Sequence, residues 1–88
     1  MTYRYRPVVL EELAAHGLRP MPATPPRMVR DCLSDIYRYE IRRLKARLLR
    51  GEMPKADYNG HVIALRKRYP LLSVPLALWT EPEGREGK

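Results

Sequence analysis

The chain contains no Phe and only one Cys, Cys32, among its 88 residues. A single cysteine excludes an internal disulfide and a cysteine-based zinc site. Cys32 falls on the apolar side of a predicted helix, so we expect it to be a small buried hydrophobic residue. Without Phe, the aromatic side chains are six Tyr and Trp79. Because a Tyr hydroxyl needs water or a hydrogen-bond partner, several rings are expected at core edges or interfaces.

Long hydrophobic runs are also missing. The longest mostly apolar segment, residues 70–79, is far too short to span a bilayer. Residues 1–6 carry charge and show no apolar signal segment. We therefore expect a cytoplasmic protein.

The sequence lacks the residue sets on which catalytic and metal sites depend. Its two histidines, His16 and His61, are too few to give a metal-ligand spacing with the acidic residues, and its five glycines are scattered. We expect no enzyme activity, no metal and no cofactor. His16 is expected to place a cation near a helix end, and His61 to lie at the edge of a helix stripe.

Acidic residues are few relative to basic ones. Asp and Glu number 10 against 17 Lys and Arg, which gives a net charge of +7 and an isoelectric point near 10.0. Such a charge favours an acidic partner, whether nucleic acid, an anionic membrane surface or an acidic protein. Genome composition or heat adaptation would explain the same Arg bias without any binding.

What the chain does contain is the pattern of a small all-α domain. Its length suits one domain, which we place at residues 1–80, followed by a mobile polar tail at 81–88. Proline at the start and glycine or proline at the end delimit three predicted helices, the last two forming an antiparallel hairpin. These helices are Pro7–His16, Pro25–Arg50 and Pro54–Tyr69. A short hydrophobic C-terminal segment follows them.

The long central helix has signals at both ends. Thr24 is predicted to cap its start through the hydroxyl, and Gly51 to end it in a left-handed conformation. Its apolar positions cover an arc about 180° wide that drifts along the helix, which predicts a different neighbour for each half, the first helix and the third. These positions are Val29, Cys32, Leu33, Ile36, Tyr37, Ile41, Leu44 and Leu48.

Three other segments carry local expectations. Gly60, inside the third helix, is interpreted as marking a close helix contact, because an internal Gly otherwise weakens a helix.

Residues 2–6 could form an extended arm, for which the sequence offers no second strand. In residues 71–79, Pro75 excludes a central strand and Ser73 is expected to cap one helical turn running to Thr80. The sequence leaves open whether this segment is core or interface.

Glu40 interrupts the apolar arc of the central helix. A lone buried carboxylate is costly, so it needs a partner, and Arg43 is the natural local one. The alternative, which we favour, is that Glu40 lies at the rim in a surface ion pair.

Basic side chains form two stripes on the C-terminal half of the central helix. With the third helix they define a candidate phosphate-binding surface, and Tyr39 is available for stacking. The alternative is a solvated face whose long Arg stems cover apolar surface. The candidate phosphate-binding residues are Arg38, Arg42, Arg43, Lys45, Arg47 and Arg66.

The stretch from residue 44 to residue 65 has a Leu-rich helix end, a Gly, and hydrophobic and aromatic positions at set spacing. The residues at these positions are Leu48, Leu49, Gly51, Met53, Tyr58 and Leu65. With this pattern the stretch resembles the short helical modules called SHOCT domains. Residues 53–55 and 59–60 depart from the family pattern. The resemblance implies a helical hairpin that serves as an interaction or oligomerisation element.

The function that these observations favour is a small non-catalytic interaction protein. It would be an accessory subunit or adaptor that docks on a larger assembly or self-associates, because its apolar and Tyr content exceeds what three helices can bury. Tyr39, Leu76 and Trp79 are the expected anchors. Nucleic-acid binding through the basic face is the alternative. Attachment to an anionic membrane with Trp79 inserted is a third option.

Overall fold

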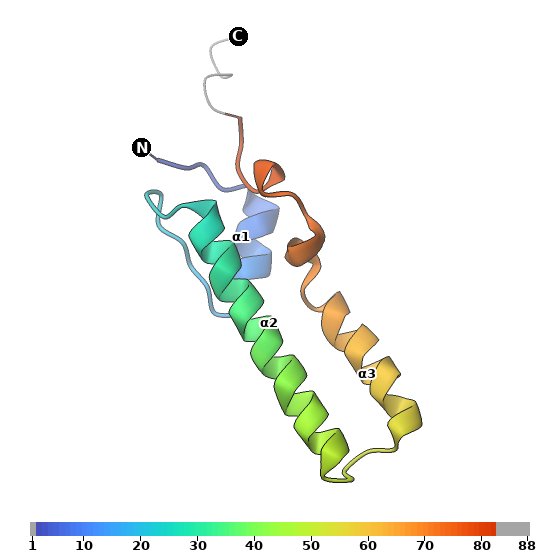
Figure 1. The fold of residues 1–88 in the computed structure, drawn as a ribbon. Coiled ribbons are helices and arrows are strands. Elements are labelled where there is room, and N and C mark those ends of the chain that lie inside the picture. Colours follow the sequence, from blue (N-terminus) through green and yellow to red (C-terminus); the bar gives the residue numbers. More distant parts are fainter. Residues whose placement is uncertain (1, 83–88) are drawn as a thin grey trace.

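The computed structural model describes residues 2–82, and within this range it is an all-α fold, as predicted. The longest helix runs along the molecule, a third helix returns antiparallel to it, and a short first helix packs beside its N-terminal half (Figure 1). Two single-turn 3-10 helices follow the third helix. The elements are α1 (Pro7–Ala14), α2 (Pro26–Leu49), α3 (Lys55–Lys67), η1 (Pro70–Ser73) and η2 (Leu76–Leu78).

The ends of α2 agree with the prediction to within one residue, but the predicted cap is wrong. Pro25 occupies the cap position, and no side chain makes a capping hydrogen bond. Thr24 lies one residue too early, so its hydroxyl instead accepts the Met21 N–H at 3.0 Å and stabilises the preceding turn. Gly51 has a φ of 78°, which confirms the left-handed end.

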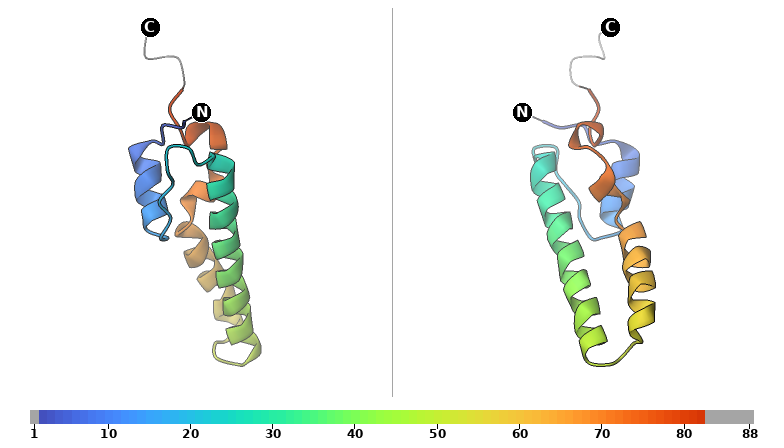
Figure 2. Two further views of the ribbon diagram at one scale, coloured as in Figure 1. Left: turned by 90° about the vertical axis from the view of Figure 1, so that its left-hand side faces the viewer. Right: turned by 45° about the vertical axis from the view of Figure 1, so that its right-hand side comes forward.

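Each half of α2 has its own neighbour, as the drifting arc predicted. Two further views show α1 beside the N-terminal half and α3 beside the C-terminal half (Figure 2). The arc is wider than the core requires, however. Val29 and Leu33 are buried, whereas Cys32 between them is exposed, so the prediction of a buried cysteine is wrong.

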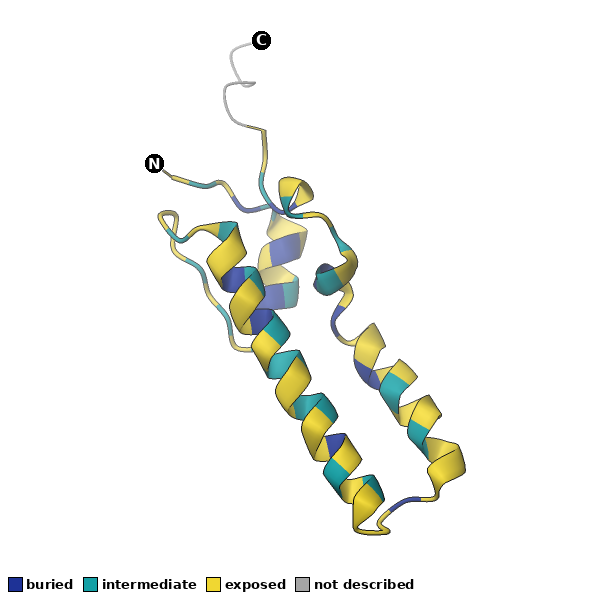
Figure 3. Cartoon of the chain, viewed as in Figure 1, coloured by how far each residue is buried: buried dark blue, intermediate teal, exposed yellow. Residues whose placement is uncertain are grey.

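The main core lies at the end of the molecule where α1 meets α2, and buried residues are concentrated there (Figure 3). Trp79 is 0% exposed, and its indole Nε1–H donates to the Val74 carbonyl oxygen at 3.2 Å. The C-terminal hydrophobic segment therefore supplies part of the core. The core cluster comprises Tyr5, Val9, Leu13, Val29, Leu33, Leu65, Tyr69, Leu71 and Trp79.

The N-terminal arm does have a pairing partner, contrary to expectation. Tyr5 forms an antiparallel bridge with Thr80, and the Arg6 N–H donates to the Trp79 carbonyl oxygen at 3.0 Å. The Glu81 N–H donates to the Arg4 carbonyl oxygen at 2.8 Å. The partner is the C-terminal segment, which the burial of Trp79 brings alongside the arm.

Two local expectations concern the C-terminal part, namely the Ser73 cap and the polar tail. Ser73 does not cap a turn running to residue 80: it is the last residue of η1, and η2 begins only after Pro75. Residues 83–88 of the predicted tail lie outside the described residues. No helix within residues 2–82 combines the length and apolar character needed to cross a bilayer.

Gly51 and Gly60 should respond to alanine in opposite directions. A Cβ at Gly60 would meet no atom within 4 Å, so this glycine marks no close helix contact, contrary to our interpretation. Gly60→Ala is expected to raise the free energy of unfolding by about 0.5–1 kcal/mol, because it removes an interior helix glycine. Gly51→Ala is expected to lower it by about 1–2 kcal/mol, since alanine would be held at a left-handed φ. Urea unfolding followed by circular dichroism measures both, and equal effects would contradict the assigned conformations.

Candidate functional site

The antiparallel pair of α2 and α3 extends away from the main core as a two-helix structure, which we call the distal hairpin (residues 40–68). Leu65 belongs both to this hairpin and to the core cluster. Only Leu44, Met53 and Leu65 are buried in it. At about 100° per residue, Arg43 and Arg47 fall on one side of Leu44, and Ile41 and Leu48 on the other. The hairpin therefore has two unlike faces.

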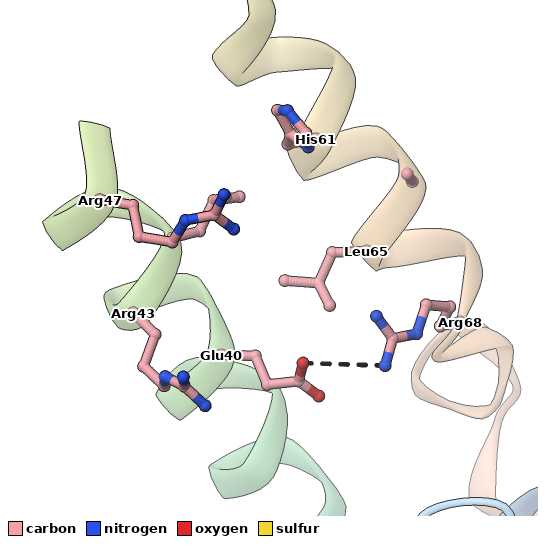
Figure 4. A pocket seen from close by; sticks show the side chains of 8 residues that line it. Glu40, Arg43, Arg47, His61, Leu65 and Arg68 are labelled. Carbon is pink, nitrogen blue, oxygen red and sulfur yellow. Dashed lines mark ion pairs between the residues drawn. The ribbon is translucent and has the colours of Figure 1, made fainter. Parts of the chain in front are cut away.

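One face contains a cleft of about 300 Å³ between the helices. Its floor is apolar and its walls carry three guanidinium groups and one carboxylate. In Figure 4, Arg43 and Arg47 lie on the α2 side, Arg68 reaches towards Glu40 from the end of α3, and Leu65 lies between the helices. The lining residues are Glu40, Arg43, Leu44, Arg47, His61, Ala64, Leu65 and Arg68.

Glu40 finds its partners just past the end of α3 rather than on its own helix. Its carboxylate accepts a hydrogen bond from the Tyr69 hydroxyl and lies 3.8 Å from an Arg68 guanidinium nitrogen. The expected partner, Arg43, instead lies over the Tyr39 ring, 5.8 Å from its centroid. Glu40 is half-buried, so the carboxylate at the edge of the arc holds the hairpin together rather than forming a purely local surface pair.

Tyr69 is the residue on which this arrangement depends. Its ring is stacked on His16 at 4.1 Å and meets Tyr37 edge-on at 5.2 Å. The His16 Nε2–H donates to the Arg68 carbonyl oxygen at 2.7 Å, so His16 joins the end of α1 to the end of α3. Burial, the hydrogen bond to Glu40 and the charge of Glu40 together raise the pKa of Tyr69 to about 12.

The six predicted phosphate-binding residues do not share one surface. Arg43 and Arg47 line the cleft, whereas Lys45 and Arg66 lie on the opposite side of their helices. Arg42 points away from both faces by the same geometry, and Arg38 pairs with Asp35 at 3.3 Å.

The cleft also contains Arg68 and His61, which were absent from the predicted set. His61 lies on α3 and Arg68 directly follows it, and both are on the side that faces α2. Only the register of the hairpin brings them to Arg43 and Arg47. The sequence already adds Arg68, at the basic end of the third helix, to the charge at this end of an antiparallel hairpin, although Arg68 is not among the six candidates.

The three expected anchor residues lie in different environments. Trp79 is fully buried, so its ring is part of the core and is not presented to a partner. Leu76 is half-buried and packs against the core. Tyr39 is 55% exposed and is the one of the three whose ring lies at the surface, beneath Arg43.

The second face of the distal hairpin has an apolar centre, flanked by Lys45 and Arg66. Ile41 and Leu48 on α2 and Tyr58 and Val62 on α3 point to the side opposite the cleft and are all half-buried. We call these four residues the apolar face. Of the four, Ile41 alone packs against the main core.

The high pKa of Tyr69 predicts a loss of stability in alkali. Between the ordinary pKa of about 10 and the folded value of about 12, the folded chain keeps a proton that the unfolded chain releases, so the stabilisation is complete below pH 10 and declines as pH rises to 12. Tyr69→Phe should lower the free energy of unfolding at neutral pH by about 1.5–3 kcal/mol, the range for a hydrogen bond to a charged group. The difference from the wild type should then shrink above pH 10.

Urea unfolding at a series of pH values measures this difference. Tyr39→Phe is the matched control, and it should change stability at neutral pH by less than about 0.5 kcal/mol. A Tyr69→Phe difference that stays constant from neutral pH to pH 12 would contradict the hydrogen bond to Glu40.

Comparison with known proteins yields no relative: no protein family, no curated protein and no solved structure matches the chain. Among residues 2–82, no three His, Cys, Asp or Glu side chains come together as metal ligands would. The two faces of the distal hairpin are thus the features from which a function has to be inferred.

Proposed function

We propose that this is a small non-catalytic interaction protein, an accessory subunit or adaptor that docks on a larger assembly or self-associates. The observation that carries the proposal is the apolar face of the distal hairpin. The main core lies at the other end of the molecule and reaches this face only at Ile41.

Two helices packed side by side can each bury only a narrow stripe. Here that stripe contains Leu44 and Leu65, and the four residues of the apolar face lie just outside it. A helix laid along this face would finish burying them, at roughly 25 cal/mol per Å² of apolar area. Partly buried apolar side chains along an open helix pair are typical of a surface that receives another helix.

The resemblance to SHOCT domains supports the same role. It covers residues 44–65, which form most of the distal hairpin, and Tyr58 belongs both to its pattern and to the apolar face. In that family the module serves as an appended interaction or oligomerisation element.

Nucleic-acid binding is the second candidate, and the three guanidinium groups in the cleft favour it. Glu40 weakens it, because a carboxylate among them repels phosphate. The membrane option loses its anchor, since Trp79 is buried.

A charge placed on the apolar face should abolish the association. Leu48→Glu and Val62→Glu are each expected to do so, because an unpaired carboxylate cannot be buried in an apolar interface. Leu49→Glu is the matched control, since Leu49 is 76% exposed and points to neither face. Sedimentation equilibrium of the purified chain measures self-association, and cross-linked capture from native extract, with and without nuclease, measures a protein partner.

The outcomes separate the candidates. The proposal expects a dimer or a discrete partner that survives nuclease and disappears with Leu48→Glu and Val62→Glu but not with Leu49→Glu. A monomer with no captured protein, or equal loss in all three variants, would overturn it. Circular dichroism of each variant verifies that the helices remain folded.

A further inference from the structure

The cleft lies on the other face of the distal hairpin, and its charged residues have no part in docking at the apolar face. Arg43 and Arg47 line the cleft from α2, the helix that carries Glu40, and Arg68 faces Glu40 from the end of α3. The three arginines and one glutamate give an excess of two positive charges around an apolar floor of Leu44 and Leu65. We infer that this cleft binds an acidic peptide segment of a protein partner, with partner carboxylates held by Arg43 and Arg47. This rests on the proposed function and names the chemistry of the partner.

Arg43 and Arg47 are the two guanidinium groups that we assign to such carboxylates. Within residues 2–82, Arg43 pairs with no carboxylate and rests on the Tyr39 ring, and Arg47 shares Glu52 with Arg50. Arg68 is directed towards Glu40, which also receives the Tyr69 hydroxyl. The nearest other acid, Glu52, accepts from Arg50 at 2.7 Å and lies farther from Arg47, at 3.5 Å. The hydrogen bond from Arg50 lowers the pKa of Glu52, so that carboxylate stays charged and is engaged mainly by Arg50.

The spacing of the two arginines matches a helical ligand. Residues four apart on a helix have Cβ atoms about 5–6 Å apart, so Arg43 and Arg47 can meet acidic side chains one turn apart on a partner helix. Guanidinium groups bind carboxylates through paired N–H donors, which gives geometric selectivity as well as attraction. Apolar side chains between the acids would then rest on Leu44 and Leu65.

Two features favour an acidic peptide over nucleic acid at this cleft. Glu40 adds a fixed negative charge beside the floor. A peptide with both acidic and uncharged residues can place an uncharged residue there, whereas the continuous phosphates of a nucleic acid would be repelled. Among the eight described residues that line the cleft, His61 is the one aromatic ring, so the cleft offers no row of rings on which successive bases could stack.

The test uses the full chain and defined probes. The first probe is a labelled peptide of repeated Glu-Leu-Ala-Ala, which places acids one turn apart with leucines between them. The second replaces every Glu by Gln, and the third is a single-stranded oligonucleotide of the same net charge. Fluorescence anisotropy at low and moderate salt gives the affinity for each.

Arg43→Gln with Arg47→Gln should weaken binding of the Glu peptide by at least about tenfold, and the Gln peptide should not bind the wild type. Arg38→Gln with Arg42→Gln is the matched control: it removes the same charge at the same spacing on the same helix, outside the cleft. It should weaken binding by less than about threefold, since it alters only the long-range field. Arg43→Lys with Arg47→Lys keeps the charge but loses the paired donors, and should give an intermediate affinity.

Three results would overturn the inference. One is absence of binding by the Glu peptide at low salt. Another is equal weakening by the cleft pair and the control pair. The third is tighter binding of the oligonucleotide than of the peptide, which would point to a phosphate-binding surface. None of these involves Leu48 or Val62, so failure here leaves the apolar face to be judged by its own variants.

Discussion

The burial of Trp79 is the interaction on which the rest of this fold depends. Its ring lies in the core, its indole N–H donates within the C-terminal segment, and its carbonyl oxygen accepts from the N-terminal arm. Removing a fully buried Trp side chain costs about 3–5 kcal/mol. The free energy of unfolding of a small domain is only about 5–15 kcal/mol, so this one ring accounts for a large share of the stability.

Because that core lies at one end, the molecule divides into a region that maintains the fold and a region available for binding. Tyr69 is the connection between them. Its ring packs with His16 and Tyr37 in the first region, and its hydroxyl holds Glu40 at the edge of the cleft in the second. The position of the cleft walls is therefore set from the main core.

Local signals predicted the helices well, and non-local contacts account for most of what was missed. Prolines and the left-handed Gly51 mark helix ends through backbone constraints that act within a few residues. The pairing of Tyr5 with Thr80 and the choice of Tyr69 and Arg68 as partners of Glu40 depend on how distant segments meet. For the same reason, helical periodicity could find Arg43 and Arg47 but not the Arg68 that faces them.

The hydrogen bond between Glu81 and Arg4 has a kinetic consequence. It closes a loop of on the order of 75 residues, whose entropic cost must be met before the contact forms. The α2–α3 hairpin joins residues much closer in sequence, and such local contacts form early in folding. The hairpin should thus fold first. The N-terminal arm (residues 2–6) should then bind last during folding and detach first during unfolding.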